Sequence, residues 1–150
     1  MKLSRKTVYG LMALIDMAIQ QERDSAGRLT THDIALRQQI PERFLEQQMT
    51  ALRNAGLLNS QRGAAGGCSL ARRADQITVL DVMEALEGSL FESLADDPDG
   101  RGGRATPAAV RELVDRARNR LADLFGSITI ADLARRELEL RESDAQMFYV

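Results

Sequence analysis

Residues 40–71 of this chain are IPERFLEQQMTALRNAGLLNSQRGAAGGCSLA, a segment whose pattern changes halfway along. Pro41 suits the first turn of a helix, and Gly56 is the expected stop of that helix. The apolar residues between them recur at three- and four-residue steps, which is typical of an amphipathic helix with one buried face. The residues of that face are Phe44, Leu45, Met49 and Leu52.

The second half of the segment predicts a short hairpin. Residues 57–61 and 68–70 flank the small residues 63–67, GAAGG. Glycine allows the positive backbone dihedral angles that a tight turn requires. We therefore expect two short antiparallel strands joined by a glycine turn.

Two helical patterns precede this segment. Ser4 is a plausible cap for a helix over roughly residues 5–21, and Thr30 or Thr31 can cap a short second helix. Residues 38–40 then have the length of a helix-turn-helix corner, so the order of elements predicts a winged helix-turn-helix. The expected buried residues are Val8, Leu11, Met12, Ile15 and Ile19 in the first helix and Ile34 and Ala35 in the second.

The second half of the sequence predicts more helices and a loop. Thr78 and Asp81 resemble a capping box, which opens a helix that Gly88 closes and that we expect to pack beside the first helix. Residues 92–105 are too polar and too rich in glycine to bury a core face. They are therefore expected to form a flexible loop.

The longest helix is expected after Thr106-Pro107. Its apolar residues are spaced like a coiled-coil seam over about five turns, or roughly 28 Å, before Gly126 ends it. A helix of this length in so small a chain is expected to project toward a partner. Thr129 and Asp132 make a box-like start for a last helix through about Arg141. The seam consists of Val110, Leu113, Val114, Ala117, Leu121 and Leu124.

Composition excludes several classes of protein. With 150 residues, 44% of them apolar, the chain can bury a substantial core. No window approaches the roughly 20 apolar residues of a membrane span, and the N-terminus lacks the signal-peptide pattern, so a cytoplasmic protein is expected. The single cysteine, Cys68, excludes an intramolecular disulfide and fits a reducing compartment.

The net charge of −2 combines two halves of opposite sign. Residues 1–75 hold 11 lysines and arginines against 7 acidic residues, or +4, whereas residues 76–150 hold 9 against 15, or −6. The basic half is where the phosphates of a nucleic acid would be met. On charge alone, a solvated surface with chance asymmetry accounts for these numbers equally well.

The helix that follows Pro41 carries polar residues opposite its apolar face, at i, i+3, i+4 and i+7. In the major groove arginine pairs with guanine, glutamine with adenine and glutamate with cytosine, while the threonine methyl contacts thymine. Any solvated helix offers such residues, but the hairpin that follows favours contact with DNA. The predicted base contacts are Arg43, Glu46, Gln47 and Thr50.

Further contacts to DNA are predicted from the hairpin and the helix ends. Arg62 stands beside the glycine turn, where a wing places a guanidinium in the minor groove; an ordinary surface hairpin is the alternative. The turn is not a nucleotide-phosphate loop, because neither Lys-Ser nor Lys-Thr follows it. The predicted phosphate contacts near helix ends are Lys2, Arg5, Lys6 and Thr31.

These motifs, in this order, resemble the Rrf2 family of bacterial winged-helix regulators over nearly the whole chain. The resemblance implies a homodimer held by the long C-terminal helix, with base contacts at Glu46 and Gln47 and a wing contact at Arg62. It rests on four groups of residues: Met1-Lys2-Leu3-Ser4 with Tyr9; Phe44-Leu45-Glu46-Gln47 with LRNAGL at 52–57; Arg62-Gly63 with Gly66-Gly67 and Leu70-Ala71; and ITVLDVMEALEG at 77–88.

Some members of that family bind an iron–sulfur cluster through three cysteines in the loop after a Leu-Glu-Gly motif, with a fourth ligand from elsewhere. Here that loop holds no cysteine, and the sites of the fourth ligand correspond to Val8 or lie near Gln38. We therefore expect no cluster. The turn also departs from the family pattern, with Ala64 and Ala65 where proline and glycine are usual and Cys68 where an aromatic residue is common.

Cys68 and His32 give little support to other chemistry. A thiol in the wing near Arg62 suggests a redox switch, whereas a small residue at the start of a strand is the simpler interpretation. His32 suits a surface or capping role near the start of the second helix. One cysteine and one histidine cannot by themselves supply four metal ligands, and nothing in their spacing suggests a catalytic pair, so neither a metal site nor an enzyme is expected.

The sequence as a whole predicts a mainly α protein. Residues 1–75 form a winged helix-turn-helix DNA-binding domain, and residues 76–150 form a helical dimerisation region. The expected function is a bacterial transcriptional regulator, a repressor that binds a palindromic operator as a homodimer and responds to a small-molecule or protein effector. Two alternatives stay open: a thiol-switched regulator that uses Cys68, and a protein-interaction module that has lost DNA binding.

Overall fold

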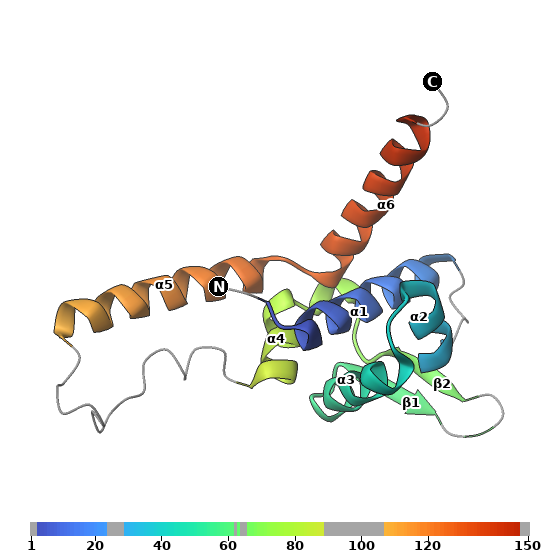
Figure 1. Ribbon diagram of the computed structural model, residues 1–150, viewed down its shortest axis with the longest axis horizontal. Coiled ribbons are helices and arrows are strands. Elements are labelled where there is room, and N and C mark those ends of the chain that lie inside the picture. The colour runs from blue at the N-terminus through green and yellow to red at the C-terminus, as the bar shows by residue number, and fades with distance from the viewer. Residues whose placement is uncertain (1–2, 24–28, 62, 64–65, 89–106, 148–150) are drawn as a thin grey trace.

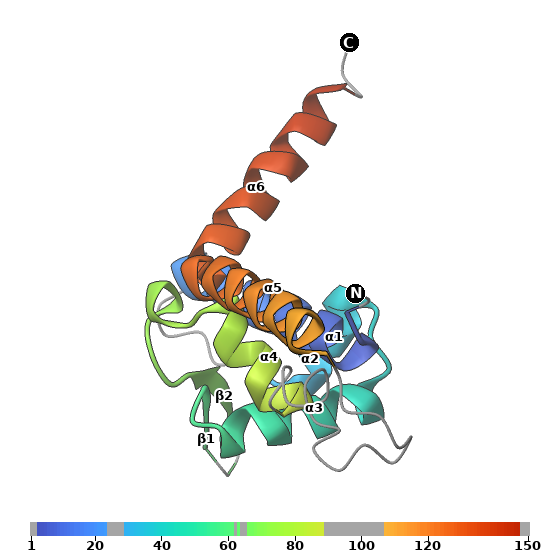
Figure 2. The ribbon, with the colours of Figure 1, turned by 90° about the vertical axis from the view of Figure 1, so that its left-hand side faces the viewer.

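The structure, a computed structural model, describes residues 3–23, 29–61, 63, 66–88 and 107–147 (Figure 1). The elements up to α4 lie together in a part that we call the head, and α5 and α6 extend from it in different directions (Figures 1 and 2). In chain order the elements are α1 (Arg5–Arg23), α2 (Thr31–Gln38), α3 (Glu42–Asn54), β1 (Leu58–Gln61), β2 (Gly67–Leu70), η1 (Ala74–Gln76), α4 (Val79–Glu87), α5 (Ala108–Ser127) and α6 (Ile130–Met147).

Helix α1 crosses the head, and Ser4 caps it as predicted, because the backbone N–H of Thr7 donates to the Ser4 hydroxyl at 3.3 Å. The predicted core face of this helix is only partly right. Val8 is 39% exposed, and only Ile19 of the five predicted residues is fully buried. Helix α4 approaches so closely that a Cβ on Gly10 would overlap the side chain of Leu86. The buried side of α1 is therefore the one with Thr7, Gly10, Ala13, Leu14, Met17 and Ala18.

The helix-turn-helix corner is formed by hydrogen bonds at both ends of α2. Thr30 is the cap, because its hydroxyl accepts the Asp33 N–H at 3.1 Å while the Asp33 carboxylate accepts the Thr30 N–H at 3.2 Å. Gln39 ends α2 in the left-handed conformation, with φ of 54°. Pro41 then occupies the cap position of α3, so two helices meet across a very short turn.

The hairpin after α3 is antiparallel, with Leu58 opposite Leu70. Leu29 extends it on the other side, since its backbone exchanges hydrogen bonds of 3.3 and 2.8 Å with Cys68. Gly63 in the turn has φ of 112°, a conformation that favours glycine. The predicted hairpin is confirmed, and its contact with Leu29 joins it to the chain that leads into α2.

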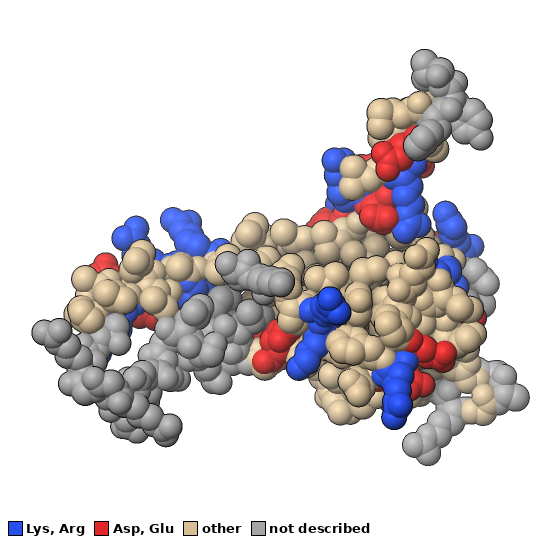
Figure 3. Space-filling model, in the orientation of Figure 1, with Lys and Arg blue, Asp and Glu red and all other residues tan. Residues whose placement is uncertain are grey.

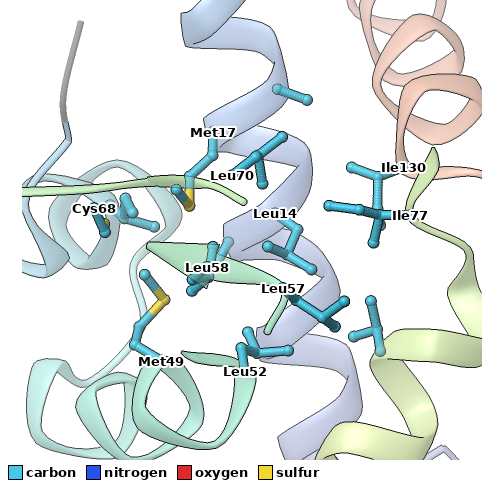
Figure 4. Close-up of a cluster of buried hydrophobic side chains, with 14 of the residues drawn as sticks. Leu14, Met17, Met49, Leu52, Leu57, Leu58, Cys68, Leu70, Ile77 and Ile130 are labelled. Carbon is cyan, nitrogen blue, oxygen red and sulfur yellow. The ribbon is translucent and has the colours of Figure 1, made fainter. Parts of the chain in front are cut away.

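A hydrophobic core fills the head between α1, α3 and the hairpin (Figure 4). Leu14, from the middle of α1, is fully buried there. Burying a leucine side chain contributes roughly 1.5–3 kcal/mol, so this cluster is the main source of stability in the head. The labelled residues of the cluster are Leu14, Met17, Met49, Leu52, Leu57, Leu58, Cys68, Leu70, Ile77 and Ile130.

The same capping motif opens α4 and α6. The Thr78 hydroxyl accepts the Asp81 N–H at 3.1 Å and the Asp81 carboxylate accepts the Thr78 N–H at 2.9 Å. Thr129 and Asp132 make the equivalent bonds at 3.1 and 3.0 Å. The two caps lie side by side, because the chain before α6 pairs with the chain before α4 through backbone hydrogen bonds of 2.9 Å. Both predicted capping boxes are confirmed.

Helix α5, with 20 residues or about 30 Å, is the longest described helix, and it buries no residue in the described part of the chain. Helix α6 continues to Met147, so its predicted end near Arg141 is wrong. Ion pairs between Arg136 and Glu139 at 2.9 Å, and between Arg141 and Glu137 at 2.7 Å, lie in the turns that end at Arg141, and the Ser143 hydroxyl beyond it donates to the Glu139 carbonyl at 2.9 Å. The apolar spacing from which the helix was predicted does not include these polar residues.

The elements together match the mainly α winged helix-turn-helix that the sequence predicts, with a small hairpin and a long C-terminal helix. The predicted loop at 92–105 lies outside the described residues. Among the helices that the structure describes, none is long and apolar enough to cross a membrane.

Candidate nucleic-acid interface

Helix α3 presents the four predicted base contacts to solvent. Arg43, Glu46, Gln47 and Thr50 are all exposed, on the side of the helix away from the core. The predicted buried face is slightly different: Phe44 is only half-buried, whereas Gln48 is buried and its amide donates to the Phe44 carbonyl at 3.4 Å. That hydrogen bond satisfies part of a polar group in the core, which a count of apolar residues cannot anticipate.

An aromatic contact holds α3 against α1. The rings of Tyr9 and Phe44 meet edge to face, with centroids 5.5 Å apart and planes at 88°. Such pairs contribute about 0.5–1.5 kcal/mol beyond the apolar area they bury. Tyr9 therefore helps to fix the orientation of α3 relative to α1, and with it the direction in which the polar face of α3 points.

A buried carboxylate holds α2 against α1. Asp16 is 4% exposed, and both Nε and Nη2 of Arg37 donate to it, with a shortest distance of 2.8 Å. The Gln38 amide donates to the same carboxylate at 3.1 Å. A buried carboxylate must be paired in this way, because the interior disfavours an isolated charge. The sequence pattern did not predict this network, although an aspartate inside the apolar pattern of the first helix was a visible signal of it.

A second charged pair lies on the surface of the helix-turn-helix. Nδ1 of His32, in the first turn of α2, lies 2.9 Å from a carboxylate oxygen of Glu42, the first residue of α3. The two side chains are 59% and 45% exposed. The hydrogen bond to Glu42, and then the negative charge of Glu42, raise the pKa of His32 above its ordinary value of 6.5.

The predicted phosphate contacts lie at helix ends where the structure describes them. Arg5 and Lys6 are exposed in the first turn of α1, and Thr31 is the half-buried first residue of α2. Lys2 and the predicted wing residue Arg62 lie outside the described residues. In the view of Figure 3, the Lys and Arg side chains of the head project at separate places and do not form one continuous patch. Along α6, basic and acidic side chains are mixed.

Cys68 is buried, with 7% of its surface exposed, and its thiol donates to the Leu29 carbonyl at 2.8 Å. Burial raises the pKa of this thiol above its ordinary value. A protonated and covered thiol reacts slowly with oxidants. The surroundings of Cys68 therefore favour the structural interpretation over the redox switch.

The residues present do not fit an iron–sulfur cluster of the kind held by several cysteines. Cys68 is the single cysteine of the sequence, and its thiol already donates a hydrogen bond to the Leu29 carbonyl. Val8, at one expected ligand position, has an aliphatic side chain, and Gln38, near the other, donates to Asp16. Within the ranges that the structure describes, no three acidic, histidine or cysteine side chains are grouped as a metal site would require.

A capped helix-turn-helix beside a hairpin, with a polar helix face turned to solvent, defines a winged-helix protein of the DNA-binding class. Comparison with known families agrees with this class, since residues 3–136 match the family model Rrf2, described as an iron-dependent transcriptional regulator. The chain belongs to the Rrf2 family of transcriptional regulators, which is not a family of enzymes.

Several individual relatives match along nearly the full length. The regulator CymR of Bacillus subtilis is 36% identical over 152 residues, covering 100% of both chains. IscR of Citrobacter koseri is 34% identical over 149 residues, covering 97% of this chain and 87% of its own. The solved structure of CymR, the global cysteine regulator of B. subtilis, superposes with a TM-score of 0.75 and 34% identity, covering 91% of this chain and 98% of that one.

Proposed function

We propose that this chain is a homodimeric repressor that inserts α3 of each copy into the major groove of a two-fold operator. The observation that carries the proposal is the exposed polar face of α3, which the contact between Tyr9 and Phe44 holds against α1, while the buried Asp16 network holds the neighbouring α2. A rigid scaffold that presents donors and acceptors to solvent is what base recognition requires. The protein would act in the cytoplasm, where bacterial DNA lies.

Within this proposal, the residues of the interface have distinct roles. Arg43, Glu46, Gln47 and Thr50 contact base edges and set the operator sequence. The wing residue Arg62 enters the minor groove. Contacts to phosphates fix the register of the head on DNA without adding sequence preference, and we assign them to Lys2, Arg5, Lys6 and Thr31.

The dimer is supported by three exposed apolar residues in the seam of α5, where Val114 and Leu121 are half-buried. Leu113 is 66% exposed, Leu124 is 51% exposed and Val110 is 45% exposed. A row of apolar side chains on one helix is unfavourable in water and is typical of an association surface. We assign the seam to a second copy of this chain, which makes residues 76–150 the dimerisation region and residues 1–75 the DNA-binding domain. The seam comprises Val110, Leu113, Val114, Ala117, Leu121 and Leu124.

Two heads joined through α5 suggest how the regulator works. A dimer on an operator blocks access of other proteins to a promoter, which gives repression by occlusion. An effector, either a small molecule or a protein, changes operator affinity only if it favours one spacing of the heads over another. We propose no resident iron–sulfur cluster, because the cysteine content of the chain does not support one.

The DNA contacts are tested by operator binding over a salt series. Arg62→Ala should weaken binding to a selected operator and reduce the salt slope by about one unit. Arg141→Ala, near the far end of α6, is the matched control and should leave the operator affinity and the salt slope unchanged.

The base contacts are tested by selection from random DNA. Gln47→Ala should alter the preferred sequence, whereas Glu84→Ala on α4 should not. Wild-type protein without salt-dependent DNA binding would instead support a protein-interaction module.

The dimer is tested by sedimentation of two matched variants. Leu113 in α5 and Leu36 in α2 have the same exposure, 66% each. Leu113→Glu should produce monomers and weaken operator binding, because it places a charge in the proposed seam. Leu36→Glu should leave the sedimentation coefficient unchanged. Dimers that survive the Leu113 substitution would rule out the seam.

Two further measurements address the thiol switch and the cluster. If operator binding by the wild type is insensitive to peroxide, or if Cys68→Ser retains any sensitivity, the thiol-switched alternative is wrong. An absorbance spectrum of protein purified without oxygen should show no visible charge-transfer bands. Such bands with stoichiometric iron would contradict the proposed absence of a cluster.

A further inference from the structure

The pair formed by His32 and Glu42 joins the two helices of the helix-turn-helix on their exposed side. His32 belongs to the first turn of α2, next to the proposed phosphate contact Thr31. Glu42 belongs to the first turn of α3, next to the proposed base contact Arg43. The first turns of both helices are where a helix-turn-helix meets DNA, so this pair stands at the proposed interface.

The charge of this pair depends on one proton. When His32 is protonated, its positive charge offsets the negative charge of Glu42 at 2.9 Å. When His32 is neutral, Glu42 presents an uncompensated negative charge where phosphates approach. DNA disfavours that second state, because like charges repel across the interface.

The other charged groups around His32 do not change this balance. Asp33, on the same helix, acts in the same direction as Glu42 on the pKa of His32 but more weakly. Its carboxylate accepts hydrogen bonds from Thr30 at the cap of α2. Helix α1, which also packs against α2, contributes Asp16, whose carboxylate accepts hydrogen bonds from Arg37 and Gln38. Glu42 is therefore the acidic partner that decides the state of His32.

We infer that His32 and Glu42 form a proton-dependent contact in the DNA interface, in which His32 neutralises Glu42 and strengthens binding at lower pH. This inference rests on the proposed function, because it needs the helix-turn-helix to meet DNA. It adds His32 and Glu42 to the residues that set affinity.

The sign and size of the effect follow from proton linkage. Nearby phosphates stabilise protonated His32, so DNA binding takes up a proton and affinity falls as pH rises through the pKa of His32. A shift of about one pKa unit on binding corresponds to about a tenfold change in affinity for each head. The change should begin near the ordinary titration range of histidine and extend above it, because the pKa of His32 in the free protein is already raised.

The pair itself is tested first, by NMR titration of the ring of His32, the only histidine of the chain. In the free wild-type protein its pKa should lie above the ordinary value of 6.5. Glu42→Gln should lower that pKa, whereas Glu84→Gln on α4 should leave it unchanged. A titration that is insensitive to Glu42→Gln overturns the inference.

The DNA contact is tested with a duplex selected from random-sequence DNA by the wild-type protein. His32→Gln should remove most of the pH dependence seen in the wild type and bind as weakly as the wild type does at high pH. Glu42→Gln should bind several-fold more tightly than the wild type at both ends of the pH range, because it removes one negative charge from the interface whether or not His32 is protonated. A pair with a merely structural role would not make removal of an acid strengthen binding.

The remaining outcomes separate this inference from the proposed function. Wild-type protein that binds no duplex overturns both. Salt-dependent binding with the same pH dependence in the wild type and His32→Gln overturns this inference alone, as does Glu42→Gln that weakens binding at every pH. Circular dichroism and sedimentation of each variant confirm that fold and oligomeric state are unchanged.

Discussion

The head and the two C-terminal helices are built from similar amphipathic sequence but bury it differently. In the head, α1, α3 and α4 each contribute several fully buried side chains to one core. In the described part of the chain, α5 buries none, and α6 buries only Ile130 and Ala134 near its start. The head is therefore stabilised within one chain, whereas α5 leaves apolar side chains of its seam exposed.

The two regions are therefore expected to serve different purposes, the head recognition and the C-terminal helices assembly. A self-sufficient head can hold α3 rigidly, which base recognition requires. A helix that leaves Leu113 and Leu124 exposed to water is stabilised by any partner that covers these side chains, including a second copy of the chain. Changes to the head should therefore act at any protein concentration, whereas changes to α5 should act through association.

The largest contrast is expected between two leucines. Leu14→Ala removes a fully buried side chain and should lower the free energy of unfolding by about 2–5 kcal/mol. Leu113→Ala, at a side chain that is 66% exposed, should lower it mainly by weakening association, with a cost that grows on dilution. Urea unfolding at two protein concentrations checks both. Losses of equal size that do not depend on concentration would contradict the comparison.

A smaller contrast is expected between two aspartates. Asp16→Asn weakens the only buried carboxylate network that the described residues show, and it should cost roughly 1–3 kcal/mol, allowing for the partial exposure of Arg37. Asp75→Asn, whose partner Arg73 is 78% exposed, should cost about 0.5 kcal/mol or less. Equilibrium unfolding measures both values. If the two substitutions cost the same, the Asp16 network does not hold α2 in place.

The capping threonines should each contribute about 1 kcal/mol but to different parts of the molecule. Thr30→Ala removes the cap of α2, and its effect should appear in the unfolding of the head. Thr129→Ala removes the cap of α6 and should appear as faster hydrogen exchange in that helix, with the exchange of α3 unaltered. Exchange measured by mass spectrometry separates the two. Faster exchange of α3 in Thr129→Ala would show that the regions unfold together.

The smallest expected effect is on how the stability of the fold depends on pH in the acidic range. Hydrogen bonds from the hydroxyl and backbone N–H of Thr30 hold the pKa of Asp33 below its ordinary value of 3.8. A carboxylate whose pKa is lowered in the folded state stabilises the fold above its unfolded pKa, and that contribution is lost as pH falls through the folded pKa. The difference in stability between the wild type and Thr30→Ala should therefore narrow as pH falls below 3.8, the ordinary pKa of this carboxyl, through its lower folded pKa. A difference that stays constant would mean that Asp33 contributes nothing through this bond.

The sequence predicted local features well because their causes are local. The capping boxes at Thr78 and Thr129 need only residues three positions apart, and the structure contains both. The polar face of α3 follows from helical periodicity, so its four residues were found and are exposed. Their contact with DNA stays a prediction. The end of α6 was placed too early because the residues beyond Arg141 are exposed and mostly polar, so they carry no apolar spacing that would extend the prediction.

Features that depend on distant neighbours were missed. The buried side of α1 is set by how closely α4 approaches at Gly10, which no periodicity in α1 reveals. Asp16 is buried because Arg37 and Gln38, more than 20 residues later, supply its hydrogen bonds. The pair of His32 and Glu42 also forms across a turn, whereas the position of His32 in the sequence suggested only a surface or capping role.

The amino-acid order was enough to establish the kind of fold, the boundaries of most helices and the residues that α3 offers to solvent, because periodicity and capping act over a few residues. The packing of one element on another established which side of α1 is buried, why Cys68 is covered, which charges are paired and that most of α5 stays exposed. Those outcomes depend on contacts between residues far apart in the chain, whose free energies arise only once the helices have been brought together.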